Sequence, residues 1–263
     1  MERPTVDVIV PHYGGTDLTW RCLLHLWAFG DPGQRIVVVD DASPDQMPVI
    51  GEWLNRSGRA IYHRHATNRG CTNAWNTGIE LTRERAAPYT AFVNNDLAVM
   101  PQTFGALLEA ARSGHRVVGV QDHIGAKLEP ELLLPAAGDG ERPLELSTGM
   151  GSSCFIVERS LLESMGGFDG RMEQGFGDTD FYMRARVEHG VVPKVVKQAR
   201  TFHGASVAAK RVGLEKSCAR FIADQDVFRS KWGDNPLENW APSWLTLEKL
   251  KPVVTETWRD GEH

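Results

Sequence analysis

Residues 6–41 read "VDVIVPHYGGTDLTWRCLLHLWAFGDPGQRIVVVDD", and this stretch decides the fold class. A short β-branched run at 6–11 is followed by a helical pattern at 17–30, and a second β-branched run occupies 35–41. Such runs are typical of buried strands, and the segment between them has the length and spacing of a helix. Strand, helix and strand in this order predict a βαβ unit with two parallel strands.

The same alternation continues through the next eighty residues. Helices are predicted at 46–56, 70–87 and 101–114, and strands at 60–65, 89–96 and 115–122. Thr16 or Asp17 is expected to cap the first helix, Gly30 to end it, and Pro101 to stand at the first position of a later one. The rhythm predicts a Rossmann-like α/β fold, with a mostly parallel central sheet and helices on both faces.

The pattern changes after residue 122. Residues 123–146 are loop-like, and 149–169 read as a strand, a short helix and a turn. A helix at 178–190, a strand at 191–203 and a helix at 214–232 follow, and the remaining tail carries Trp240, Trp244 and Trp258. We expect this tail to pack on the core, to cover a site or to form a dimer face.

Composition is that of an ordinary soluble globular protein, with 263 residues, 41% apolar and 24% charged, and a net charge of −5. The net charge argues against a broad nucleic-acid surface. Four scattered cysteines form no zinc pattern and suggest reduced thiols. No signal peptide and no run near the roughly 20 apolar residues of a membrane span is found. We therefore expect a cytoplasmic protein, with attachment to the inner membrane surface as an alternative.

Residues 92–101, "FVNNDLAVMP", end a predicted strand in two amides and an acid. Asn and Asp are ordinary turn residues, so a simple turn is one interpretation. The other is a site, because ligands of open α/β sheets bind beyond the carboxyl ends of the strands. Asp96 offers an oxygen ligand of the kind that Mg²⁺ or Mn²⁺ takes, and His203 after a late strand is a candidate second ligand. An ordinary histidine at a strand end is the alternative for His203.

Other strand ends also carry polar side chains. Tyr13 follows the first strand and either stacks on a nucleotide base or packs under the next helix. Asp40 and Asp41 follow the second strand and accept hydrogen bonds either from a base or ribose or from their own turn. No GxGxxG and no Walker loop is present, which argues against hydride-transfer enzymes and P-loop kinases.

Two helix starts are also candidates for the site. In "NRGCTNAWNTGIE" (68–80) the backbone N–H groups near Gly70 could face an anion, and Arg69 could pair with a phosphate. Asn73 and Asn76 lower the helix propensity of this segment, which indicates a further role for them. In "GFGDTDF" (175–181), Asp178 and Asp180 are either helix-start residues or carry a general base.

Taken together and in this order, these segments resemble the family 2 glycosyltransferases with the GT-A fold. The pieces that carry the resemblance span residues 5–206 and read "VDVIVPHYG", "IVVVDDASPD", "NRGCTNAWNTGI", "FVNNDLAVMP", "GSSCFIVERSLLESMGGFD", "GFGDTDFYMRARVEHG" and "TFHGAS". The resemblance implies an inverting enzyme, a nucleotide-sugar donor such as a UDP- or dTDP-sugar, and a divalent cation, Mn²⁺ or Mg²⁺. It also implies transfer of a single sugar to a glycan or lipid-linked sugar, with protein or modified DNA as further alternatives.

The resemblance also assigns expected roles by position. Donor-binding roles fall on Pro11, Tyr13, Asp41, Asn68, Arg69, Asn95 and Asp96; the cation falls to Asp96 and His203, and the general base to Asp178. Asn94 stands where the family has the first acid of its DxD motif, which removes one negative charge. Gly14 and Gly177 also depart from the usual Asn and Glu.

The resemblance further implies a GT-A catalytic domain at 1–212, with a nucleotide-sugar-binding half at 1–122 and an acceptor half with the base at 123–212. Residues 213–263 then form a helical, Trp-rich C-terminal extension, through which a homodimer could form. Two rival functions remain open. A nucleotidyltransferase of similar architecture would need a phosphate loop after the first strand, and "PHYGGTD" has none; a non-catalytic nucleotide- or sugar-binding module needs only the cleft.

Overall fold

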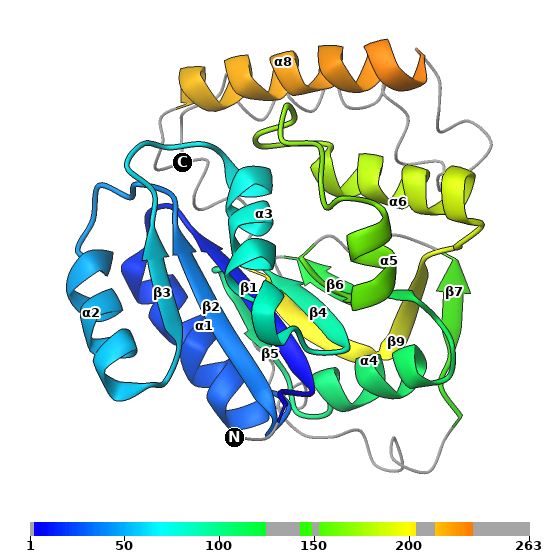
Figure 1. The fold of residues 1–263 in the computed structure, drawn as a ribbon, viewed down its shortest axis with the longest axis horizontal. Coiled ribbons are helices and arrows are strands. Elements are labelled where there is room, and N and C mark those ends of the chain that lie inside the picture. Colours follow the sequence, from blue (N-terminus) through cyan, green and yellow to red (C-terminus); the bar gives the residue numbers. More distant parts are fainter. Residues whose placement is uncertain (1–2, 125–142, 149–152, 204–213, 234–263) are drawn as a thin grey trace.

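A computed structural model describes residues 3–124, 143–148, 153–203 and 214–233 (Figure 1). Its central sheet has nine strands: β1 (Val6–His12), β2 (Gln34–Asp40), β3 (Ile61–Arg64), β4 (Tyr89–Val93), β5 (Leu97–Val99), β6 (Val117–Ile124), β7 (Leu146–Thr148), β8 (Cys154–Glu158) and β9 (Lys194–His203). The helices are α1 (Thr16–Phe29), α2 (Met47–Ser57), α3 (Cys71–Leu81), η1 (Arg83–Arg85), α4 (Thr103–Arg112), α5 (Arg159–Ser164), α6 (Gly177–His189) and α8 (Leu214–Trp232).

The sheet has a parallel half and a mixed half. Its order is β3-β2-β1-β4-β8-β6-β9-β5, with β7 paired to β9. Strands β3, β2, β1 and β4 are parallel, as the βαβ rhythm predicts. Strand β8 is inserted antiparallel between β4 and β6, so β6 runs in the same direction as β4 but does not pair with it. The α/β fold class is confirmed, and the antiparallel pairs are confined to the second half.

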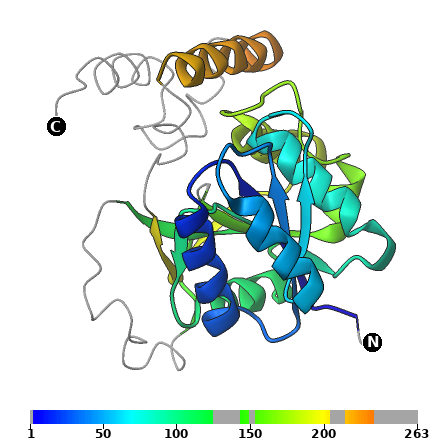
Figure 2. The ribbon, with the colours of Figure 1, turned by 90° about the vertical axis from the view of Figure 1, so that its left-hand side faces the viewer.

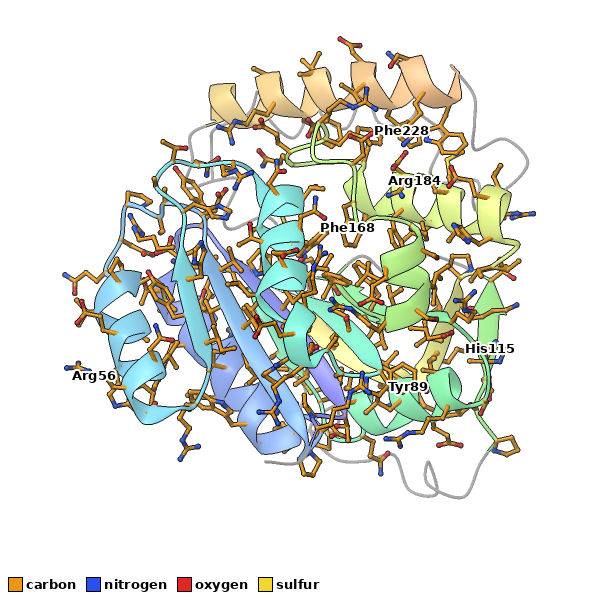
Figure 3. All side chains as sticks on the ribbon, in the orientation of Figure 1. Arg56, Tyr89, His115, Phe168, Arg184 and Phe228 are labelled. Carbon is orange, nitrogen blue, oxygen red and sulfur yellow. The ribbon has the colours of Figure 1, made fainter. Side chains whose placement is uncertain are left out.

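Helices cover both faces of the sheet, and each face packs on its helices through a separate hydrophobic core. Along β1, Val6, Val8 and Val10 face α1, α2 and α4, whereas Ile9 faces α3, α5 and α6. This alternation follows from the two-residue period of a strand. On the second face Phe168 lies between Trp75 of α3 and Phe181 of α6, with ring centroids 5.0 and 4.7 Å away (Figure 3).

Helix α8 lies at the periphery, along the edge where α3 and α6 begin (Figures 1 and 2). Phe228 extends from it toward the start of α6 and stacks on Phe176, at 5.1 Å between ring centroids (Figure 3). Trp232 donates its indole N–H to Asp180 of α6 at 2.8 Å. The predicted helix at 214–232 is thus confirmed, and it packs on the residues that lead into α6.

Three predicted boundaries were wrong. The helix expected at 70–87 ends at Leu81, and a 3₁₀ turn follows. At this end the hydroxyl of Thr82 donates to the carbonyls of Gly78 and Ile79. The strand expected at 89–96 ends at Val93. Pro101 precedes its helix instead of opening it, because Gln102 has a φ of 68° and cannot be helical.

Part of the expected organisation lies outside the described residues. The boundary at 212–213 and the tail with Trp240, Trp244 and Trp258 belong to this part, so the domain limits and the dimer face stay predictions. In the described portion of the chain, no helix combines the length and the apolar character needed to cross a membrane.

The start of α1 is capped from a distant loop. Gly15, with a φ of 80°, precedes the helix, so neither Thr16 nor Asp17 is its cap. The carboxylate of Asp45 instead accepts hydrogen bonds from the backbone N–H of Thr16 at 3.0 Å and of Met47, at the start of α2, at 3.2 Å. One side chain therefore serves two helix starts and ties together the loops that follow β1 and β2.

Asp45→Ala should destabilise the fold by about 0.5–2 kcal/mol, the cost of losing a helix cap. Burial alone would raise the pKa of Asp45, but hydrogen bonds from Thr16, Ser43 and His12 lower it. The carboxylate therefore stabilises the fold above its unfolded pKa of about 3.9, and this contribution disappears as the pH falls through the lower folded value. Melting curves should show the largest difference from wild type near pH 7. Glu52→Ala on the exposed face of α2 is the control, and an equal loss in both variants would contradict the capping role.

Candidate active site

A cleft of about 290 Å³ opens at the carboxyl ends of β1, β2 and β4, between these strand ends and α8. Its walls come from segments far apart in the sequence. They are formed by Pro11, His12, Tyr13, Asp41, Asn68, Gly70, Cys71, Asn94, Asn95, Asp96, Gln174, His203 and Arg220. The residues to which the resemblance gives a site role all line this cleft except Arg69 and Asp178. Asp40, the other acid after β2, is not in the wall; it accepts hydrogen bonds from Ser43, Tyr62 and Arg64. The position is the one expected for a ligand site in an open α/β sheet.

Asp96 and His203 lie together because of a strand register. Strand β5 pairs antiparallel with β9, and Leu97 stands opposite His203. Asp96 immediately precedes Leu97, so its carboxylate reaches the imidazole, with 3.1 Å between Oδ1 and Nε2. Sequence spacing could not predict this contact, since it depends on the return of β9 beside β5.

The "NND" stretch is both a turn and a wall of the cleft. Leu97 N–H donates to the carbonyl of Asn94 at 3.2 Å, which closes the turn. The amide of Asn95 donates to Thr19 at 2.9 Å and to the carbonyl of Gly14 at 3.3 Å. Asn95 therefore fixes the loop after β1, and the turn directs Asp96 into the cleft.

Asp41 organises the start of α3. Its carboxylate accepts the backbone N–H of Arg69 at 2.8 Å and of Gly70 at 2.7 Å, and it also contacts the ring of His65 at 2.7 Å. Sequence analysis suggested that these backbone donors face a ligand anion; the anion that they bind is Asp41. The side chain of Arg69 is exposed and is not part of the cleft wall.

The two asparagines inside α3 hold the loop that leads toward α6. Asn76 exchanges two hydrogen bonds of 2.9 Å with the backbone of Phe168, and Asn73 donates to the carbonyl of Gly170 at 2.9 Å. Gly70 has a φ of 88°, and a Cβ there would meet the carbonyl of Glu173. These contacts give the predicted further role of Asn73 and Asn76: they join α3 to the loop before Asp178.

Asp178 lies in the first turn of α6, where it accepts the backbone N–H of Thr179 at 2.7 Å. Burial raises its pKa, and the bonds from Thr179 oppose this shift. The pKa of Cys71, a wall residue, is raised first by burial and then by the charges of Asp178, Asp41 and Asp96. A Cβ on Gly177 would meet the side chain of Thr72, so the start of α6 packs on the start of α3 and Asp178 lies near the cleft wall at Cys71.

Asp180 has a structural role. It is fully buried and is bonded to Arg184 at 2.8 Å, to Trp232 at 2.8 Å and to Lys231 at 2.7 Å. Its charge is thus compensated by partners that hold α8 against α6. The two acids at this helix start therefore differ in their environment: Asp180 is fully buried among its partners, whereas Asp178 is half-buried, and desolvation raises its pKa.

Asp96 and His203 fit a divalent cation. A carboxylate oxygen and an imidazole nitrogen are ligands that Mn²⁺ accepts, and one or two protein ligands suffice where substrate phosphates supply the others. Across the ranges that the structure covers, no group of three or more His, Cys, Asp or Glu side chains could hold a metal alone. A cation at this pair would therefore need ligands from a bound substrate.

Sequence analysis missed four residues of the cleft wall: His12, Cys71, Gln174 and Arg220. His12 and Cys71 adjoin the predicted segments, and the signal for them was their position at a strand end and a helix start. Gln174 and Arg220 had no such signal. They reach the cleft only because α8 folds back over the residues before α6.

Comparison with known families matches residues 7–161, more than half of the chain, to the family described as Glycosyl transferase family 2. The chain belongs to this family. The resemblance drawn from the motifs is confirmed, and glycosyltransferase is the enzyme class of the family. Asp178, His203 and Arg220 lie beyond the matched residues.

Individual relatives support the same fold. EpsJ of Bacillus subtilis (strain 168), described as an uncharacterized glycosyltransferase, is 32% identical over 108 residues, which are 41% of this chain and 30% of that protein. The match thus spans less than a third of this relative. The mannosyltransferase PcManGT of Pyrobaculum calidifontis, solved with GDP-Man and Mn²⁺, has a TM-score of 0.62 at 19% identity, over 97% of this chain and 69% of its own.

Two further solved structures share the architecture at low identity. Residues 1–349 of TarS from S. aureus have a TM-score of 0.59 at 17% identity, over 94% of this chain and 77% of that one. GalNAc-T7, solved with UDP, GalNAc and Mn²⁺, has a TM-score of 0.64 at 13% identity, over 96% of this chain and 54% of its own. At these identities the likeness establishes the GT-A fold alone.

Proposed function

We propose that this protein is an inverting glycosyltransferase, which moves one sugar from a nucleotide-diphosphate sugar to an acceptor hydroxyl with the help of a divalent cation. The observation that carries this proposal is the shared cleft, in which Asp41, Asp96 and His203 line one cavity, while the start of α6 with Asp178 packs on the cleft-lining start of α3. A nucleotide subsite, a pair of cation ligands and a candidate base at one sheet edge are what such a transfer requires.

The donor would lie across the carboxyl ends of β1, β2 and β4. Pro11 and Tyr13 form the wall after β1, where an aromatic ring can stack on a base, and Asp41 and Asn68 line the wall beside them. The expected donors are UDP- and dTDP-sugars, and the GDP-Man of the Pyrobaculum structure adds guanine to the bases worth testing. Arg69 stands at the rim, with its side chain in solvent.

Asp96 and His203 would hold Mn²⁺ or Mg²⁺ together with the diphosphate of the donor. When bound, the cation supplies positive charge that stabilises the departing diphosphate. Asp178 takes the proton of the acceptor hydroxyl, whose oxygen attacks the anomeric carbon from the face opposite the diphosphate. The bond between that carbon and the phosphate oxygen breaks, its electron pair leaves with the nucleoside diphosphate, and the configuration inverts.

The acceptor would enter from the side of Asp178, and a glycan or a lipid-linked sugar is the expected class, with protein and modified DNA as alternatives. The shape of the described cleft wall favours none of them. The functional test therefore begins with the donor.

A melting screen with UDP-, dTDP- and GDP-sugars and Mn²⁺ should single out one donor, because a ligand at 100 times its Kd stabilises the native state by about 2.7 kcal/mol. That donor should then be consumed, with release of the nucleoside diphosphate, when glycan acceptors are added, and EDTA should stop the reaction. Failure of every nucleotide sugar to bind or react would refute the proposal. Tight donor binding without hydrolysis or transfer on any acceptor would favour the non-catalytic binding module.

A further inference from the structure

Helix α8 contributes directly to the cleft. Arg220 of this helix and Gln174 of the loop before α6 line it together with the strand-end residues. Among the wall residues that the structure describes, Arg220 alone carries a permanent positive charge, whereas Asp41 and Asp96 are acids. A nucleoside diphosphate would add further negative charge to this cleft. A guanidinium in its wall is therefore well suited to receive a phosphate group, which it can bind through two parallel N–H donors.

The present partners of Arg220 are weak competitors for a phosphate. Its guanidinium donates to the amide oxygen of Asn68, a neutral acceptor, and lies 3.6 Å from the carboxylate of Glu173, beyond ordinary hydrogen-bond distance. The side chain keeps 35% of its surface exposed. Arg220 can therefore turn toward a ligand without leaving a buried charge unpaired.

The position of Arg220 is fixed by Asp224, one helical turn further along α8. Asp224 is buried, and its carboxylate accepts the backbone N–H groups of Glu173 at 3.0 Å, Gln174 at 2.7 Å and Gly175 at 2.8 Å. The carbonyl of Glu173 in turn accepts the N–H of Thr72 in α3 at 3.2 Å. Helix α8 is thus bonded through this loop to the start of α3, which itself is held by Asp41.

We propose that Arg220 is a donor-binding residue that contacts the diphosphate, and that Asp224 is a positioning residue that holds α8 and Arg220 at the cleft. The inference rests on the proposed function, because it requires a nucleotide diphosphate in this cleft. The inference assigns to Arg220 of α8 the phosphate contact that the sequence motifs alone assign to Arg69. The ligand that Arg220 would recognise is a diphosphate attached to a nucleoside. The residues after β1 and β2 would select the base.

Arg220→Gln should weaken binding of the matching nucleoside diphosphate, measured by calorimetry with Mn²⁺, by roughly 10- to 100-fold. The affinity for the nucleoside monophosphate should fall much less. The decisive quantity is therefore the Kd of the monophosphate divided by the Kd of the diphosphate, which should fall in the variant. Arg220→Lys should retain part of the preference. Arg56→Gln, an exposed position on α2 (Figure 3), is the charge-matched control and should bind both nucleotides as wild type does.

Asp224→Asn should reduce the same ratio, because an amide cannot accept three backbone N–H groups as a carboxylate does. Asp226→Asn, an exposed acid on the same helix, is its control. A merely structural role for Asp224 would lower the melting temperature and leave the ratio unchanged. If Arg220→Gln binds the diphosphate as tightly as wild type does, the inference is wrong while the proposed function stands. If wild type binds no nucleoside diphosphate, both fall.

Discussion

Asp178→Asn should lower kcat by about 10²–10⁴-fold, the usual contribution of a positioned general base. The variant should still bind the nucleotide donor as wild type does, because Asp178 is not part of the cleft wall. Steady-state kinetics and calorimetry separate the two effects. An amide keeps the size of the side chain and can still accept the backbone N–H of Thr179, so the local structure is preserved.

The control for this experiment is Glu188→Gln, which removes an exposed carboxylate from the same helix. It should leave kcat unchanged. Normal turnover of Asp178→Asn with saturating donor and acceptor would remove Asp178 from the mechanism. Loss of donor binding in that variant would instead point to a role in the donor subsite.

The raised pKa of Asp178 adds a pH signature to this experiment. The base must be ionised to accept a proton, so kcat/KM should fall as the pH drops through a value above that of an ordinary Asp. The stability effect has the opposite sign. A carboxyl whose folded pKa lies above its unfolded value stabilises the fold at low pH and loses this contribution as the pH rises through the folded pKa. At neutral pH, Asp178→Asn should therefore melt no lower than wild type.

The parallel half of the sheet could be predicted because each of its elements has its own local signal. The β-branched runs of β1 and β2 and the helical pattern of α1 lie next to one another in the chain, and a βαβ unit admits essentially one handed arrangement. The insertion of β8 between β4 and β6 has no local signal, since it depends on pairing between strands that are some 60 residues apart in the chain. Chain order alone predicts β6 as the neighbour of β4, a place that β8 occupies.

The candidate site shows the same division. Asp41 and Asp96 could be found because Asp41 directly follows a buried strand and Asp96 lies in the short turn after another, and strand ends of one sheet edge meet. The contact between Asp96 and His203 required the β5–β9 register, and the role of Arg220 required α8 to fold back across the molecule. Asp45 ends the quoted segment "IVVVDDASPD", and nothing in that segment shows that its side chain caps a helix that begins 29 residues earlier. Residues that act through distant partners carry no pattern in their own neighbourhood.

Asp96→Asn should abolish the effect of Mn²⁺ on donor binding. Asp96 is the only carboxylate of the "NND" turn, because Asn94 stands where the family has the first acid of its DxD motif. Replacing Asp96 therefore leaves His203 as the single remaining protein ligand of the pair. We expect calorimetry with the nucleoside diphosphate to show a gain of at least about tenfold on adding Mn²⁺ to wild type and none for the variant. Glu109→Gln, an exposed acid on α4, is the control and should keep the full gain.

A double-mutant cycle with His203→Gln decides whether the two residues hold the same ion. If Asp96 and His203 share one cation, removing either destroys most of the Mn²⁺-dependent affinity, and the double variant loses little more than Asp96→Asn does alone. If only Asp96 binds the cation, His203→Gln keeps the Mn²⁺ effect. If neither variant changes the Mn²⁺ effect, the 3.1 Å contact is an ordinary ion pair and the cation binds elsewhere. The cycle thus tests the geometry at the centre of the proposed mechanism without requiring knowledge of the acceptor.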